Sequence, residues 1–140
     1  MVATAFSRQG RSEQATPLLE EAVKLDGGTA TSLHQLALNY INQHDHDSAL
    51  KRLGELTSNY PSNMAGHVTI TTFRLAQRKY AEAIEAAKIA LAIEPGHANL
   101  RNLLGVALTK AGDLNKAEQT FEDLVANDPS YAPHKSTWPK

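Results

Sequence analysis

Two histidines and two aspartates alternate in His44-Asp45-His46-Asp47, the densest cluster of potential metal ligands in the sequence. Imidazole nitrogens and carboxylate oxygens bind zinc and related ions, so a loop folded back on itself could hold a metal here. The same residue types are also typical of a turn before a helix, where they accept hydrogen bonds from backbone N–H groups. We interpret the cluster as such a turn and expect no physiological metal site, although an adventitious ion could bind.

The rest of the sequence offers no arrangement of residues that predicts catalysis. Nucleophile elbows and glycine-rich phosphate loops have recognisable patterns, and neither pattern occurs here. Gly27-Gly28 is too short to cradle a phosphate and is typical of a helix end. The chain has no cysteine, which excludes disulfides and thiolate chemistry. We therefore predict a protein that is not an enzyme and that needs no metal or cofactor.

Charged side chains are nearly balanced, with 14 Lys and Arg against 15 Asp and Glu and a net charge of −1. This balance gives no reason to expect nucleic acid or an anionic membrane as a partner. Arg74, Arg78 and Lys79 form a small basic patch that could hold an acidic peptide, but nearby glutamates favour ordinary surface charge. Acidic pairs such as Glu20-Glu21 are likewise interpreted as members of solvated ion pairs on polar helix faces.

The hydropathy of the chain does not predict a membrane protein. No apolar run approaches the roughly 18 residues of a membrane span, so membrane insertion is not expected. The opening segment MVATAFSRQG lacks the basic region and the long apolar stretch of a signal peptide. We predict a soluble protein, for which the cytoplasm and the periplasm both stay open.

A period of 34 residues organises the elements that carry these side chains. Prolines recur at this interval at Pro61, Pro95 and Pro129, and alanines recur at Ala49, Ala83 and Ala117. A fixed period of this length is the signature of stacked helix–turn–helix units, because each unit can bury its apolar face only against its neighbours. The period therefore predicts a stack of helix pairs.

Each period contains two apolar stripes with helical spacing, separated by a short turn. In the last unit the turn is Gly112-Asp113, a left-handed C-terminal residue followed by a helix cap. Small residues such as Gly105 and Ala117 are expected to let the paired helices approach closely. We divide the chain into five segments: a truncated first unit at 1–29, complete units at 30–63, 64–97 and 98–131, and a tail at 132–140.

The truncated unit has the same phase as the complete ones. Gly10 falls where Gly112 ends the first helix of the last unit, and Gly27-Gly28 replaces the terminating proline. We therefore expect a clipped first helix in this unit, followed by a second helix with Pro17 near its start. The phase would begin before Met1, which predicts a piece of a longer array.

This layout resembles the tetratricopeptide repeat family. The residues that carry the resemblance in the last unit are Leu104-Gly105, Leu108, Gly112, Ala117, Phe121 and Pro129. Leu33, His67 and Arg101 replace the large aromatic residues common in the first helix of the family's units, and Thr71 stands at a position that is usually Gly or Ala. The resemblance implies an all-α fold, a right-handed superhelix (solenoid) of antiparallel helix pairs, of the kind found in bacterial arrays.

In arrays of this kind the first helices of successive units line a concave groove. The stripe opposite the packing alanines supplies the expected peptide-binding residues, which are mainly amides, hydroxyls and small aliphatics: His34, Gln35, Leu38, Asn42, Val68, Thr69, Thr72, Asn99, Asn102, Val106, Thr109 and Lys110. Amides both donate and accept hydrogen bonds, so they suit the backbone of an extended peptide. Some family members hold a C-terminal carboxylate with a clamp of basic residues, and that clamp does not map onto this sequence.

The sequence thus predicts a protein–protein interaction scaffold that binds a peptide or a partner protein of unknown identity in this groove. The alternative is a self-assembly module that stacks end to end through uncapped terminal helices. Its apolar contacts would be Val2 and Phe6 at one end and Leu114, Phe121 and Val125 at the other. The segment 131–140 is expected to be poorly ordered unless Trp138 docks on the last helix or on a neighbouring molecule.

Overall fold

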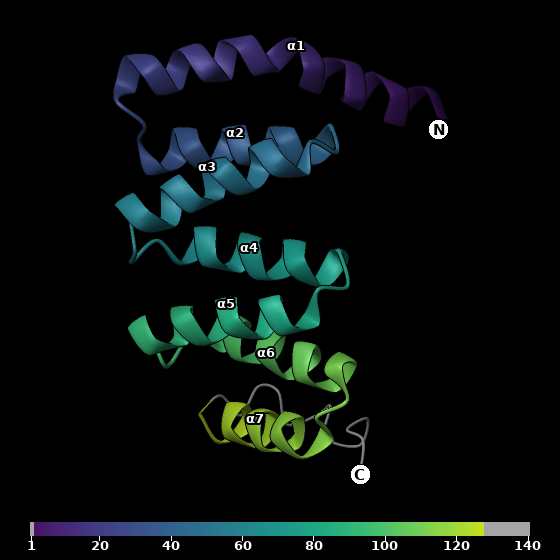
Figure 1. The fold of residues 1–140 in the computed structure, drawn as a ribbon, viewed down its shortest axis with the longest axis vertical. Helices are drawn as coiled ribbons and strands as arrows, with labels where there is room; N and C mark the ends of the chain where they lie inside the picture. Colours follow the sequence, from purple (N-terminus) through teal and green to yellow (C-terminus); the bar gives the residue numbers. More distant parts are fainter. Residues whose placement is uncertain (1, 128–140) are drawn as a thin grey trace. The chain divides into compact units, whose positions relative to one another are not determined.

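The computed structural model describes the backbone of residues 2–127 and the side chains of residues 11–126 (Figure 1). The described chain is helical throughout and contains no strand, which confirms the predicted all-α fold of helix pairs. Its helices are α1 (Val2–Asp26), α2 (Ala30–Asn42), α3 (His46–Asn59), α4 (Met64–Ala76), α5 (Tyr80–Ile93), α6 (Ala98–Ala111) and α7 (Leu114–Asn127). The expectations for residues 1 and 128–140 lie outside the described residues.

The helices repeat at the interval found in the sequence. α2, α4 and α6 begin 34 residues apart, and so do α3, α5 and α7. The turns inside the pairs repeat too, because His44, Arg78 and Gly112 all have a positive φ, of 62°, 61° and 90°. In each turn the next N–H bonds back to a carbonyl five residues earlier, at 2.9 Å. This bond ends the first helix and aims the chain into the second.

The chain forms two compact units, residues 1–66 and 67–140, which are described separately. In the first unit α2 packs against both α1 and α3. Six side chains of α2 and α3 form its core and are at most 1% exposed: Leu33, Leu36, Ala37, Ala49, Leu53 and Leu56. They recur at three- and four-residue steps, which places them on the facing sides of the two helices.

In the second unit α6 packs against both α5 and α7. Its core combines alanines of α5 with alanines and leucines of α6 and α7, among them Ala83, Ala87, Ala90, Leu100, Ala107, Ala117 and Leu124. The packing alanines predicted from the period are buried, with Ala83 fully inaccessible and Ala117 only 1% exposed. A Cβ atom added at Gly105 would lie 2.6 Å from the ring of Phe121, so the predicted close approach of α6 and α7 is confirmed.

The first unit differs from the expected helix pair. α1 is one continuous helix that runs through both Gly10 and Pro17. Glycine is tolerated inside a helix at a cost of about 1 kcal/mol, so α1 can continue through Gly10. The expected break at Gly10 is therefore wrong. The expected helix end at Gly27-Gly28 is confirmed, because both residues have a positive φ, of 75° and 77°.

Candidate functional site

The turn at residues 44–47 caps a helix. His44 adopts the left-handed conformation, and Asp45 Oδ1 accepts a hydrogen bond from the Ser48 N–H at 3.3 Å at the start of α3. The rings of His44 and His46 stand 6.4 Å apart, edge to face, and both residues are exposed. The interpretation as a capped turn is confirmed. Among residues 2–127 no three His, Cys, Asp or Glu side chains gather into a group that could hold a metal ion.

The predicted groove residues of α2 lie opposite its buried stripe. Gln35, Leu38 and Asn42 are exposed, and His34 is half-buried. Successive residues turn by about 100° around an α-helix, which places these four side chains on one face, away from the core of α2. We call this the α2 face.

The predicted groove residues of the second unit lie on α4 and α6, and none of them is buried. On α6, Asn99 and Lys110 are exposed, whereas Asn102, Val106 and Thr109 are half-buried. We call these five residues the α6 face. On α4, Thr72 is exposed while Val68 and Thr69 are half-buried. Each face gathers its residues along one helix, and a groove that joins the faces stays a prediction.

The amide side chains of these faces are not used inside the protein. Those of Gln35, Asn42, Asn99 and Asn102 make no hydrogen bond to any residue in the described part of the chain. The hydroxyls of the threonines behave differently, since Thr72 and Thr109 each donate to a carbonyl four residues earlier, at 2.8 Å. These hydroxyls keep only acceptor capacity, whereas the four amides keep both donors and acceptors.

Two other amides, one on α2 and one at its C-terminal cap, form hydrogen bonds to α1. Asn39 Nδ2 donates to Thr16 Oγ1 at 2.8 Å, and Gln43 Nε2 donates to the Ser12 carbonyl at 3.0 Å and also to Thr16 Oγ1. Asn39 is only 7% exposed. The amides of this segment therefore have two roles. Asn39 and Gln43 bond to α1, whereas the amides of the α2 face make no hydrogen bond within the described residues.

A network around Glu20 was not found from the sequence. Arg52 on α3 contacts Glu20 on α1 at 2.6 Å and Glu55 at 3.1 Å, and the Tyr40 hydroxyl donates to Glu20. Burial and this hydrogen bond raise the pKa of Tyr40 to about 12. Glu20 thus forms an ion pair as expected, but its side chain is only 27% exposed and its partners come from two other helices. No local spacing signals partners 20 and 32 residues away.

The basic patch predicted at residues 74–79 is partly neutralised. Arg74 Nη1 pairs with Glu82 at 3.0 Å, joining α4 to α5, whereas Arg78 and Lys79 are exposed in the turn.

At the end of α1, hydrogen bonds from Ser32, and also from the backbone of Thr29 and Gly28, lower the pKa of Asp26. The Asp26 carboxylate therefore accepts hydrogen bonds that stabilise the turn after α1.

The sequence matches two families described as tetratricopeptide repeat, one over residues 31–63 and one over residues 74–136. The two matches together cover more than half of the chain. The comparison with curated proteins gives no match. Within the described residues no helix is both long and apolar enough to span a membrane.

Several solved structures share the fold. MamA (41-end) from Desulfovibrio magneticus RS-1 is 21% identical with a TM-score of 0.70, and the match covers 91% of this chain and 72% of that one. Another MamA structure is 18% identical with a TM-score of 0.73, over 89% and 68% of the two chains. TTC0263, a thermophilic TPR protein of Thermus thermophilus, is 20% identical with a TM-score of 0.66, over 91% and 72%. These similarities show an all-α solenoid of helix pairs.

Proposed function

The chain belongs to the tetratricopeptide repeat family, and from this premise we propose that it binds an extended peptide of a partner protein along its first helices. Members of this family are in general protein–protein interaction scaffolds and are typically not enzymes. The peptide would contact the α2 face and the α6 face, together with Val68, Thr69 and Thr72 of α4. The proposed role is that of a non-catalytic scaffold.

The observation that supports this proposal is the unused hydrogen-bonding capacity of Gln35, Asn42, Asn99 and Asn102. An extended peptide presents one N–H and one carbonyl per residue, and a side-chain amide can pair with both. Leu38 is 41% exposed on the same face as two of these amides and offers an apolar contact beside them. Amides and small aliphatic side chains without a strong net charge suit a peptide backbone better than a charged motif.

The proposal is tested with a peptide selected on the wild-type chain from a library of random peptides. Changing both Asn42 and Asn102 to alanine should weaken binding about tenfold or more, because each lost hydrogen bond is worth roughly 0.5–1.5 kcal/mol. The control changes Glu85 and Lys88, two exposed residues of α5, to alanine and should leave the affinity unchanged. Fluorescence anisotropy gives the affinities, and circular dichroism checks that helicity is kept. Weaker binding in the control alone would move the site to the second helices.

Self-assembly is the second candidate, and exposed leucines favour it. Leu114 at the start of α7 is 53% exposed, and Leu18 and Leu25 on α1 are 73% and 79% exposed. Leu18 and Leu25 are seven residues apart and therefore share one face of α1. Val2 and Phe6 have side chains outside the described residues, and Phe121 and Val125 are half-buried. Light scattering over a concentration series decides this candidate, since a strict monomer at high concentration would refute it.

A further inference from the structure

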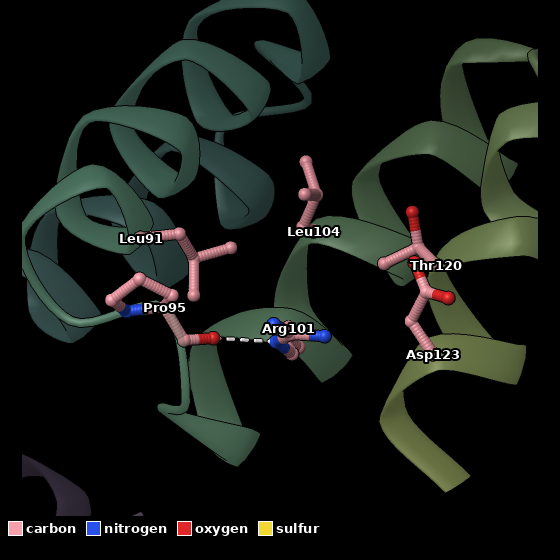
Figure 2. A pocket seen from close by; sticks show the side chains of 6 residues that line it. All are labelled: Leu91, Pro95, Arg101, Leu104, Thr120 and Asp123. Atoms are coloured by element: carbon pink, nitrogen blue, oxygen red, sulfur yellow. Dashed lines mark hydrogen bonds between the residues drawn. The ribbon is translucent and has the colours of Figure 1, made fainter. Parts of the chain in front are cut away.

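The second unit contains a pocket that belongs to none of the first-helix faces (Figure 2). It has a volume of about 250 Å³ and is lined by Leu91, Pro95, Arg101, Leu104, Thr120 and Asp123. Figure 2 shows the residues from the end of α5 on one side and those of α7 on the other, with Leu104 and Arg101 of α6 between them. At about 100° per residue, Leu104 lies about 160° around α6 from both Asn102 and Val106, and Arg101 lies about 100° from Asn102 and about 140° from Val106. The pocket and the α6 face are therefore on different sides of this helix.

The polar groups of the pocket combine one cation with two acceptors. Arg101 Nε donates to the Pro95 carbonyl at 2.6 Å, which fixes the guanidinium at the pocket. Its two terminal nitrogens make no hydrogen bond within the described part of the chain. Thr120 Oγ1 donates to the Lys116 carbonyl at 2.8 Å, so its oxygen offers only acceptor capacity to a ligand. A carboxylate has about four acceptor positions, so Asp123 can accept a hydrogen bond in addition to those it already has.

The apolar part of the pocket is lined by side chains that continue the core of the second unit but are not fully buried. Leu91 and Leu104 continue the apolar stripes of α5 and α6, yet both are only half-buried, and Pro95 is exposed. Covering such surface with an apolar group is favourable. The pocket volume exceeds the roughly 150 Å³ of a cavity known to hold benzene, and it is below the roughly 300–1,000 Å³ of pockets for larger ligands. A single aromatic side chain therefore fits the size better than a cofactor does.

From these features we infer that the pocket binds an indole ring, the side chain of a tryptophan. The ring would lie on Leu91, Leu104 and Pro95, with the guanidinium of Arg101 against its π face, where aromatic rings attract cations. The indole N–H is a donor without acceptor capacity and matches the acceptors on Thr120 and Asp123. An aliphatic side chain would leave these polar groups unused, and a carboxylate ligand would meet the like charge of Asp123.

Two sources can supply this ring: a partner peptide and the chain itself. Trp138 is the only tryptophan of the chain and lies outside the described residues. It stands eleven positions after Asn127, the last residue of α7, and an extended segment of eleven steps spans up to about 36 Å. Asp123 is only about 6 Å from Asn127 along the helix axis, so the ring can reach the pocket. Holding one side chain costs loop-closure entropy, which grows slowly with loop length.

The first arm of the test measures Trp138 emission in the full chain, because no other tryptophan contributes. If the ring comes from the same chain, emission is blue-shifted and acrylamide quenching is several-fold weaker than in the urea-unfolded protein, at every protein concentration. Arg101→Ala and the isosteric Asp123→Asn should both raise the quenching towards the unfolded value. Arg11→Ala, at an exposed residue of α1, is the matched control and should change nothing. Protection that is lost on dilution would assign the ring to a neighbouring copy.

The second arm removes the internal source with Trp138→Phe and adds N-acetyltryptophanamide as the probe. If the ring is supplied by a partner, the probe emission shifts to the blue on binding, and both pocket variants weaken the binding several-fold. N-acetylleucinamide is the matched probe without an indole and should not compete. Circular dichroism shows whether Arg101→Ala is folded. If it is not, the test uses Asp123→Asn alone, because Asp123 is exposed. The inference is overturned if neither arm detects indole binding, or if both pocket variants leave it unchanged.

Discussion

Replacing either of two glycines by alanine should have opposite effects on stability. Gly105 on α6 faces the ring of Phe121, and an added Cβ would lie 2.6 Å from two ring carbons. Gly54 on α3 is exposed, and a Cβ there would meet nothing within 4 Å. Both positions are inside helices, so both variants gain about 0.5–1 kcal/mol from the lower conformational entropy of the unfolded chain. Gly54→Ala should therefore be more stable than the wild type by about this amount.

Gly105→Ala adds a steric cost to the same gain. Carbon atoms in ordinary contact stand about 3.5–4.0 Å apart, so the Phe121 ring or α6 must retreat by about 1 Å. Overpacking of this kind costs roughly 1–3 kcal/mol. The free energy of unfolding of Gly105→Ala should thus be lower than that of Gly54→Ala by about 1–3 kcal/mol, because the shared helix term cancels in the comparison.

Urea unfolding followed by far-ultraviolet circular dichroism measures both variants. The double variant Gly105→Ala with Phe121→Leu provides the mechanistic check, because a shorter side chain should remove part of the clash. Its loss of stability should be smaller than the sum of the two single losses. Equal stabilisation by both glycine replacements would refute the reasoning, since α6 and α7 would then have room for a methyl group at their contact.

Three further predictions test other parts of the fold. Ala83→Leu should lower the free energy of unfolding by roughly 1–3 kcal/mol, since Ala83 is fully buried, whereas the same change at the exposed Ala81 should be nearly neutral in thermal unfolding. Arg78→Gly should raise stability by about 1 kcal/mol, because Arg78 has a φ of 61°, and Lys88→Gly inside α5 should lower it by a similar amount in urea unfolding. The Tyr40 pKa of about 12 exceeds its ordinary value of 10, so its contribution to stability is present below pH 10 and is lost as the pH rises through 12. Tyr40→Phe should remove this loss of stability at high pH, together with the phenolate absorbance change that occurs at the highest pH. If the free energy of unfolding depends on pH in the same way in both proteins, the role given to Tyr40 is contradicted.

The sequence predicted the repeating helix pairs because their signals are periodic and local. Prolines and alanines at 34-residue intervals, with apolar stripes between them, placed the starts of the complete units at Ala30, Met64 and Ala98, and α2, α4 and α6 begin at these residues. These features depend on backbone conformation and on side-chain size. Both can be inferred from residues that are close together in the sequence. Gly105 was identified from its small size alone, and the structure adds that the ring of Phe121 is what its Cβ would meet.

Features that depend on partners far along the chain were not predicted. The continuous α1 was missed because a glycine in phase with the turn residues suggested a break, although a helix can also run through a glycine. The pocket was missed for a related reason. Arg101 was recognised as a substitute for an aromatic residue, but nothing in the sequence shows that its guanidinium bonds to the Pro95 carbonyl and leaves the space beside Leu104 open.

Inside each of the two units the helices are held together by a different kind of contact. This difference determines which substitutions and which pH changes destabilise each unit. In the first unit, hydrogen bonds join α1 to the helix that packs on it, from Asn39 and Gln43 to α1 and from Tyr40 to Glu20. In the second unit the helices meet through small apolar residues such as Ala83 and Gly105. Removing one partner of a buried hydrogen bond leaves the other unsatisfied, whereas a close apolar contact is disturbed mainly by added volume. Polar deletions and high pH should therefore loosen α1, and volume changes should loosen α5 to α7. The unbonded amides of the α2 and α6 faces take part in neither mechanism, so they can be changed to test binding without disturbing either unit.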